Sequence, residues 1–156
     1  MKKIIILLIL LLVACSLNNT PEAKVEELLS KYQLLNKNIE INYQDLINDN
    51  NLTKENIKEI EKIIKKQYQN MTYEIKEEMV DGNSATVTSQ IEVYNYKKII
   101  ENNYLNKDYK KTIKELKKTK EKITYTINFK LTKNKNEKWK LKELTDEEKN
   151  KLLGSF

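Results

Sequence analysis

The sequence lacks the residues on which most hydrolytic active sites depend. None of its 156 residues is histidine, and Cys15 is the single cysteine. Without histidine, neither a Ser-His-Asp nor a Cys-His arrangement can form, so the usual nucleophilic triads are excluded. A single thiol also excludes an intrachain disulfide, so packing alone has to stabilise the folded chain.

Arginine is absent as well, and glycine occurs only at Gly82 and Gly154. Proteins that read nucleic acids and phosphates rely on the bidentate arginine side chain, and phosphate loops need closely spaced glycines. We therefore expect no nucleic-acid partner and no cofactor. The acidic clusters Glu77-Glu78 and Asp146-Glu147-Glu148 are interpreted as surface charge and helix capping, so no metal site is predicted. Together these absences predict that the protein is not an enzyme.

Long hydrophobic runs are also missing, apart from a short one at the start. Two lysines precede eleven apolar residues, from Ile4 to Ala14, and Cys15 follows. A membrane-spanning helix needs about 20 apolar residues, whereas this layout is typical of a secretory signal. Leu12-Val13-Ala14-Cys15 has the residue order of a lipobox, whose thiol accepts the diacylglyceryl group. The alternative, a buried or free thiol, is disfavoured because the cysteine directly follows the apolar run.

Lipidation of Cys15 predicts an anchor at the outer face of the cell membrane. Each buried methylene contributes about 0.8 kcal/mol, so two or three acyl chains hold a protein firmly. In a host with two membranes, we expect Ser16 after the cysteine to permit onward transport to the outer one. The predicted organisation is a signal peptide over 1–14, a lipidated tether over 15–20 and a single domain over 21–156.

Periodicity of the apolar residues predicts an α+β domain. Thr20, Thr53 and Thr145 are predicted N-caps, and the alternation over 73–79 and 85–93 on either side of Asp81-Gly82-Asn83 predicts a hairpin. The predicted elements are helices over 21–36, 39–48 and 54–71, strands over 72–79 and 85–93, a helical segment over 96–119 that breaks near Asn106, strands over 123–131 and 138–142, and a helix over 145–153. This order, ααα-ββ-α-ββ-α, places N-terminal helices on a four-stranded antiparallel sheet.

Several short segments also resemble a known family in their order and spacing. They are Lys31-Tyr32-Gln33, Gln67-Tyr68-Gln69-Asn70 with Tyr73-Glu74-Ile75, Asp81-Gly82 with Ala85-Thr86-Val87, Tyr125-Thr126-Ile127-Asn128-Phe129, and Lys138-Trp139. The pattern resembles small exported lipoproteins of Gram-positive and related AT-rich bacteria with the cone-shaped fold of nuclear transport factor two-like proteins. The resemblance implies a pocket between the sheet and the helices. It implies no catalytic residues, because a shared fold does not fix a function.

Two groups of side chains are candidates for binding. Tyr73, Tyr125, Phe129 and Trp139 fall at inward strand positions, where they line a ligand pocket or form the core. The segment 97–122 holds ten lysines and four acidic residues. Its basic face contacts an anionic surface or is simply solvated. The residues of this predicted basic face are Lys110, Lys111, Lys114, Lys117 and Lys118.

Two functional hypotheses follow from these features. The first is a non-enzymatic, membrane-anchored envelope lipoprotein that binds an unknown small molecule or protein partner through its domain. The alternative is a structural or interaction lipoprotein without a ligand pocket, whose lysine-rich face contacts anionic lipid or cell-wall polymer.

Replacing Cys15 with serine tests the predicted lipid anchor. We expect Cys15→Ser to leave an unlipidated precursor, because a hydroxyl does not replace the thiol as acceptor of the diacylglyceryl group. Detergent-phase partitioning of the expressed protein measures the effect, and the variant should stay in the aqueous phase. Normal acylation of the variant would refute the lipobox.

Overall fold

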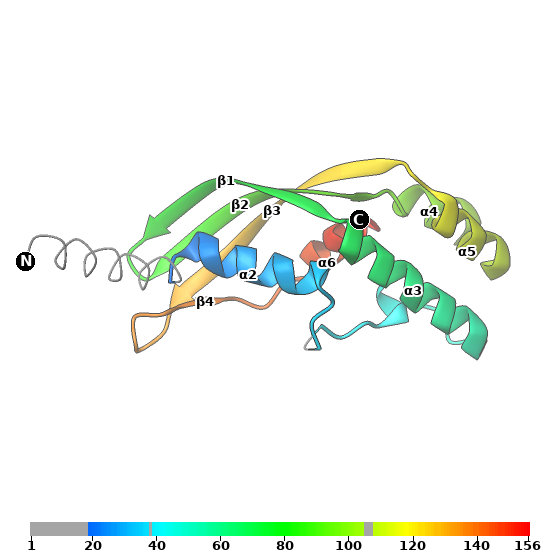
Figure 1. The fold of residues 1–156 in the computed structure, drawn as a ribbon, viewed down its shortest axis with the longest axis horizontal. Helices are drawn as coiled ribbons and strands as arrows, with labels where there is room; N and C mark the ends of the chain where they lie inside the picture. Colours follow the sequence, from blue (N-terminus) through cyan, green and yellow to red (C-terminus); the bar gives the residue numbers. More distant parts are fainter. Residues whose placement is uncertain (1–18, 38, 105–107) are drawn as a thin grey trace, which may run out of the picture.

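The computed structural model describes residues 19–37, 39–104 and 108–156 of the chain (Figure 1). The predicted signal peptide 1–14, Cys15 and residues 16–18 of the predicted tether lie outside the described residues. The elements in chain order are α2 (Pro21–Gln33), the 3-10 turn η1 (Tyr43–Asp45), α3 (Lys54–Asn70), β1 (Thr72–Asp81), β2 (Ser84–Tyr94), α4 (Lys97–Tyr104), α5 (Tyr109–Lys118), β3 (Lys122–Lys133), β4 (Trp139–Leu141) and α6 (Asp146–Leu153).

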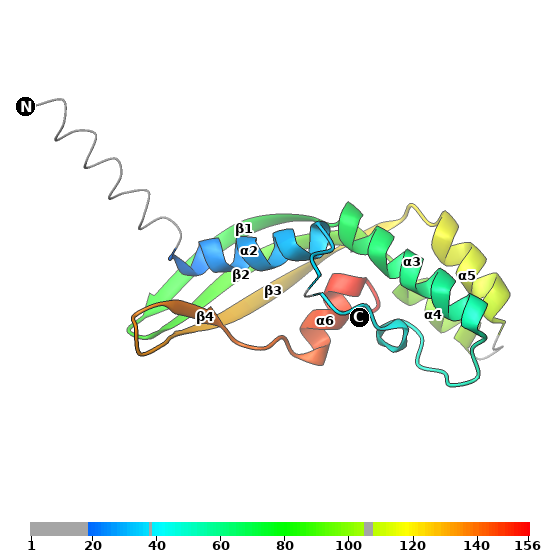
Figure 2. The same cartoon turned by 60° about the horizontal axis from the view of Figure 1, so that its bottom comes forward.

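The four strands form an open antiparallel sheet in the order β1-β2-β3-β4. Alternate residues of β2, from Ala85 to Val93, are buried, as the predicted hairpin requires. Figures 1 and 2 show α2 and α6 along one side of the sheet. On the opposite side β3 exposes polar residues such as Thr126 and Asn128. The predicted α+β class and four-stranded antiparallel sheet are therefore confirmed.

The core lies between the inner face of the sheet and the helices. Its fully buried members come from α2, α3, β2, β3 and α6, so distant parts of the chain share it. They include Val25, Leu29, Ile60, Val87, Ile91, Phe129 and Leu153. Burial of an aliphatic or aromatic side chain of this size contributes about 1.5–3 kcal/mol.

Threonine side chains begin the three helices for which they were predicted. The Oγ1 atoms of Thr20, Thr53 and Thr145 accept the N–H of the third residue along at 3.1, 3.2 and 3.2 Å. At α6 the Glu148 carboxylate also accepts the N–H of Thr145 at 2.7 Å, which completes a capping box. These caps satisfy N–H groups that a helix start otherwise leaves without partners.

The predicted helix over 39–48 is wrong, because the described residues of this range form only the single turn η1. Side chains bond to the neighbouring backbone at both ends of it. The Asn42 Oδ1 accepts the N–H of Gln44 at 3.0 Å, and the Asp49 Oδ1 accepts the N–H of Asn51 at 2.7 Å. Such local bonds compete with the helical hydrogen-bond ladder.

The helical segment predicted over 96–119 is divided into α4 and α5. The first helix ends at Tyr104 and the second begins at Tyr109, so the predicted break falls in residues 105–107, which are not described. Among the described residues the order is therefore α-η-α-ββ-αα-ββ-α. The predicted order ααα-ββ-α-ββ-α differs from it in the second and fourth helical elements.

A β-bulge in β1 changes which side chains face the helices. The alternation predicted for residues 73–79 holds only as far as Ile75, because the pairing register with β2 shifts between Ile75 and Glu77. Beyond the bulge Glu78 pairs with the buried Val87. The Glu78 carboxylate accepts the N–H of Glu22 at 2.8 Å, in the first turn of α2. The bulge thus places an acid where the helix dipole favours negative charge.

A buried glutamine joins α3, β2 and α6. Gln67 is fully buried, and its Nε2 donates to the carbonyl oxygens of Tyr94 at 2.8 Å and of Leu153 at 2.7 Å. Its Oε1 accepts the N–H of Tyr94 at 3.0 Å. One side chain therefore satisfies three backbone groups from two other elements.

Gly154 lies directly beside this glutamine and ends α6, as predicted. Its φ is +71°, and a Cβ built on it would lie 2.0 Å from the Tyr94 carbonyl oxygen and 2.6 Å from the Gln67 Nε2. Its own carbonyl oxygen accepts the N–H groups of Tyr96 and Lys97, both at 2.9 Å, where α4 begins. Only a residue without a side chain fits this junction.

A pair of glycine substitutions tests the junction. Gly154→Ala should lower the free energy of unfolding by at least about 3 kcal/mol, because it adds overpacking to an unfavourable left-handed backbone. Gly82→Ala is the matched control, since Gly82 has φ +54° but no atom within 4 Å of the position that a Cβ would take. It should cost about 1 kcal/mol. Urea denaturation measures both, and equal losses would contradict the close approach at Gly154.

Candidate functional site

A cavity of about 450 Å³ lies where the last turns of α2 and α3 meet residues 39–45 and the α6 region. Its volume falls within the range of about 300–1,000 Å³ that is usual for small-molecule sites. The residues that line it are Tyr32, Ile39, Glu40, Asn42, Asp45, Tyr68, Glu143 and Lys149.

The way in which α2 ends brings one wall of the cavity into place. The helix ends at Gln33, three residues before the predicted end, because Leu35 adopts a left-handed φ of +49°. The N–H groups of Leu35 and Asn36 then bond to the carbonyl oxygens of Tyr32 at 3.1 Å and Lys31 at 3.0 Å. This Schellman-type C-terminal motif turns the chain sharply. Residues 39–45 then pass next to the Tyr32 side chain.

Two tyrosines form the aromatic part of the cavity. The Tyr32 and Tyr68 rings meet edge to face, with centroids 4.8 Å apart and an angle of 60° between their planes. Burial raises the pKa of both hydroxyl groups, with the negative charge of Asp45 as a further cause. Both phenols are therefore neutral at physiological pH.

The Tyr68 hydroxyl is the unusual polar group of this cavity. Only 5% of the Tyr68 side chain is exposed. Within the described part of the chain, no hydrogen bond engages its hydroxyl. The ring is buried, but the hydroxyl oxygen is not among the described side-chain atoms that are both buried and without a partner, so it is open to the cavity. Its position on a cavity wall leaves it available to a ligand.

The polar rim of the cavity is acidic. Three carboxylates and one ammonium line the cavity, from Glu40, Asp45, Glu143 and Lys149. Their formal charge is −2, whereas the whole chain has a formal charge of +6. Lys149 is itself paired with Asp146 at 3.8 Å. Burial raises the pKa of Asp45 above its ordinary value. The positive charge of Lys149 lowers this pKa, and the negative charges of Glu40 and Asp146 raise it further. A bound cation would relieve this concentration of negative charge.

The combination of these groups suits one class of ligand. The face of an aromatic ring attracts a cation through the ring quadrupole, and the attraction increases when water is excluded. Carboxylates accept hydrogen bonds from an ammonium, and a neutral phenol hydroxyl accepts one as well. The arrangement can therefore hold a small organic cation, with its charge at Asp45 and its apolar part against Tyr32 and Tyr68.

The four aromatic residues predicted to line a pocket lie in different surroundings. Phe129 is fully buried in the core, and Trp139 is 8% exposed, as its inward strand position predicted. Tyr73 lines a shallow hollow beside α2, and Trp139 borders a smaller one of about 230 Å³. The Tyr125 hydroxyl donates to the Phe156 carbonyl oxygen at 2.8 Å, with the two rings edge to face. Of the two predicted alternatives, pocket or core, Phe129 takes the core position.

The predicted basic face forms part of a groove between α3 and α5. All its members except Lys111 line this groove of about 410 Å³, opposite Glu55 and Glu59. Glu59 bonds to Lys117 and, at 2.7 Å, to Lys62. These ammonium groups, Lys117 first, lower the pKa of Glu59 to about 2. The acids of α3 therefore balance part of the positive charge of α5.

The sequence prediction assigned Tyr32 and Tyr68 to the helices but missed their part in a site. Both occupy apolar-face positions, where spacing alone indicates core. The available signal was that each tyrosine falls in the last turn of its helix. There the ring can be buried while the hydroxyl emerges at the helix end. Asp45 gave no signal, because it was predicted to lie within a helix.

Neither a metal centre nor a membrane-spanning helix is formed by residues 19–37, 39–104 and 108–156. These residues include no group of three or more histidine, cysteine, aspartate or glutamate side chains placed to hold a metal ion. No helix in this part of the chain has the length and apolar character that crossing a bilayer requires. No protein-family model, curated protein or solved structure matches the chain.

Removing the Tyr68 hydroxyl tests whether it lacks a partner. Tyr68→Phe should change the free energy of unfolding by less than about 0.5 kcal/mol, because the hydroxyl is open to the cavity and makes no hydrogen bond within the described part of the chain. Tyr125→Phe is the control and should lower it by about 0.5–1.5 kcal/mol, since that hydroxyl donates to Phe156. Urea denaturation compares the two. A larger loss for Tyr68→Phe than for Tyr125→Phe would show that the Tyr68 hydroxyl is satisfied.

Proposed function

We propose that the chain is an exported, membrane-anchored lipoprotein without enzymatic activity, which binds a small organic cation. Cys15 carries the anchor, and the cavity between Tyr32, Tyr68 and Asp45 carries the ligand. The observation that supports binding most strongly is the aromatic pair of Tyr32 and Tyr68 on the wall of a cavity whose rim carries three carboxylates and one ammonium.

We also propose that the domain is a variant of the cone-shaped, nuclear transport factor two-like fold. An antiparallel sheet with helices along one side and a cavity among the helix ends supports this assignment. The proposal of cation binding does not depend on it, because that proposal rests on the side chains of the cavity.

The alternative is a lipoprotein whose basic face contacts an anionic wall polymer. Lys110, Lys114 and Lys118 on the groove between α3 and α5 support it. The alternative is weaker because Glu55 and Glu59 form the facing wall of the same groove and Glu59 already binds Lys117.

Calorimetric titration with an alkylammonium ion tests the proposed function. n-Butylammonium should bind to the mature chain, whereas n-butanol and pentanoate, which share its butyl group, should not. Asp45→Asn should weaken binding about ten-fold, the equivalent of about 1.4 kcal/mol, because the ion pair is lost. Asp81→Asn, a matched change at the exposed β1–β2 turn, should leave the affinity unchanged.

Two results would remove the proposal. Equal affinity for butylammonium and butanol would show that charge is not recognised, and equal effects of Asp45→Asn and Asp81→Asn would place the binding elsewhere. Binding of pentanoate in preference to butylammonium would instead favour the basic groove.

Binding of the cation should depend on pH with a defined sign. The ionised form of Asp45 attracts the ammonium, so affinity should increase as pH rises through the Asp45 pKa, which lies above the ordinary value. Bound cation lowers this pKa, so binding at a pH near it should release a proton. Titrations from about pH 4 to about pH 7 span the ordinary aspartate range and its upward shift. An affinity that falls over this interval would contradict the role of Asp45.

A further inference from the structure

One end of the molecule is formed by the tips of two hairpins and the start of α2. Figures 1 and 2 show the β1–β2 turn, the β3–β4 turn and the start of α2 together at this end, with α5 at the other end. The two turns are joined directly, because the N–H of Lys133 donates to the carbonyl oxygen of Asn83 at 2.9 Å. We call the surface formed by residues 79–83 and 130–142 the hairpin end.

The chain enters the domain at the hairpin end. The Asn19 Oδ1 accepts the N–H of Trp139 at 3.1 Å, and its Nδ2 donates to the carbonyl oxygen of Glu137 at 3.3 Å. Four residue steps separate Cys15 from Asn19 in the sequence, a reach of at most about 14 Å. An acyl anchor on Cys15 would therefore hold this end within about two Debye lengths of the lipid headgroups.

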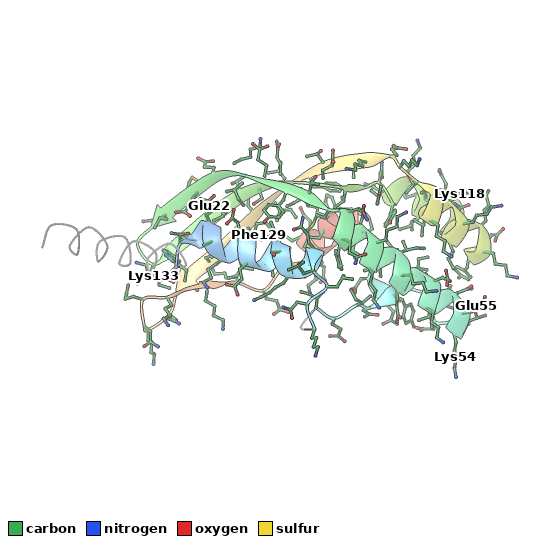
Figure 3. The ribbon with its side chains drawn as sticks, viewed as in Figure 1. Glu22, Lys54, Glu55, Lys118, Phe129 and Lys133 are labelled. Atoms are coloured by element: carbon green, nitrogen blue, oxygen red, sulfur yellow. The ribbon has the colours of Figure 1, made fainter. Side chains whose placement is uncertain are left out.

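The hairpin end is strongly basic. Its residues include six lysines, all within 130–142, and two acidic residues, Asp81 and Glu137, a formal charge of +4. Lys135, Lys138 and Lys140 are exposed. Lys133 lies 5.2 Å from the centroid of the Trp139 ring and 3.5 Å from Glu137 (Figure 3 labels Lys133). A cluster of lysines next to a membrane anchor is complementary to anionic lipid.

Apolar side chains accompany this charge. Met79 and Val80, next to the β1–β2 turn on the edge strand β1, are 54% and 53% exposed, so two adjacent apolar side chains lie at the surface of the hairpin end. Lipid headgroups give such side chains a partly apolar environment, whereas a soluble polyanion does not. Charge and exposed apolar surface at one end point to a lipid surface as the partner.

We infer that the hairpin end docks on anionic lipid headgroups, with the lysines of residues 130–142 over the phosphates and with Met79 and Val80 at headgroup depth. This inference rests on the proposed anchor at Cys15, and it deepens that proposal by orienting the domain. From Pro21 to Tyr32, α2 extends for about 17 Å. Docking at the hairpin end therefore keeps the cavity of Tyr32 and Tyr68 clear of the headgroups.

Vesicle binding by the unlipidated chain Ser16–Phe156, which contains every residue of the core, tests the inference. This chain should co-sediment with vesicles that contain phosphatidylglycerol and phosphatidylcholine at a molar ratio of about 1:2. It should not co-sediment with vesicles of phosphatidylcholine alone. The variant Lys135→Gln, Lys138→Gln, Lys140→Gln should bind about 100-fold more weakly, since each lysine contributes about five-fold. The variant Met79→Ser, Val80→Ser should bind about ten-fold more weakly.

The matched control carries the same loss of charge at the opposite end. Lys110→Gln, Lys111→Gln, Lys118→Gln should change the affinity by less than about two-fold, because α5 lies far from the hairpin end. Equal losses in the two triple variants would overturn the inference, since they would indicate attraction by net charge alone. Unchanged binding of the Met79→Ser, Val80→Ser variant would overturn it in favour of a soluble polyanion. Unaltered melting temperatures confirm that each variant is folded.

This experiment is separate from the test of the anchor. The chain Ser16–Phe156 has no acyl group, so vesicle binding does not depend on modification of Cys15. If the chain binds vesicles and the Cys15→Ser variant is still acylated, the docking surface stands and the lipobox assignment is wrong. Lipidation that requires Cys15, without vesicle binding at the hairpin end, would retain the anchor and remove the docking surface.

Discussion

The side-chain amide of Gln67 is the constraint on which the arrangement of the helices depends. It bonds to the backbone of Tyr94 and Leu153, so α3, the end of β2 and the end of α6 share one buried junction. A buried amide has to satisfy both its donor and its acceptor, and this leaves α3 little freedom to rotate. Gly154 is needed at the same place because any side chain would collide with that amide and with Tyr94.

The cavity follows from this junction. Tyr68 is the next residue of α3, so the rotation that Gln67 fixes also directs the Tyr68 ring towards Tyr32 on α2. The position of α6, held through Leu153, places Lys149 on the rim. The aromatic pair and the charged rim therefore come from elements that are far apart in the sequence but are held by one set of hydrogen bonds.

The molecule has two ends with different surfaces. At the hairpin end, Asn19 ties the entering chain to the β3–β4 turn, and the bulge in β1 directs Glu78 to the start of α2. At the other end, the lysines of α5 face acids of α3 and are partly neutralised. Lysine content alone would favour the α5 segment as the lipid contact. The position of Asn19 favours the hairpin end.

Local signals in the sequence were sufficient for much of the fold. Threonine N-caps, the period-two alternation of β2 and the Asp81-Gly82-Asn83 turn depend on neighbouring residues, and the structure confirms them. The helix predicted over 39–48 is wrong because the Asn42 and Asp49 side chains accept the backbone N–H groups of residues two positions further along, which apolar spacing does not reveal. The bulge beyond Ile75 depends on pairing with β2.

The site was less accessible to prediction from the sequence. Tyr32, Asp45 and Tyr68 are brought together by tertiary packing, and no local pattern links them. Phe129 and Trp139 were correctly predicted to lie on the inner face of the sheet. That face, however, is packed core. Strand alternation predicts burial, and it cannot distinguish a filled core from a cavity.

A crystal structure of the mature chain with n-butylammonium bound tests the central claim most directly. The cation should lie against the faces of Tyr32 and Tyr68, with the Asp45 carboxylate nearby and the Gln67 junction unchanged. A cavity filled by its own side chains, or a cation bound only at another surface, would contradict the account.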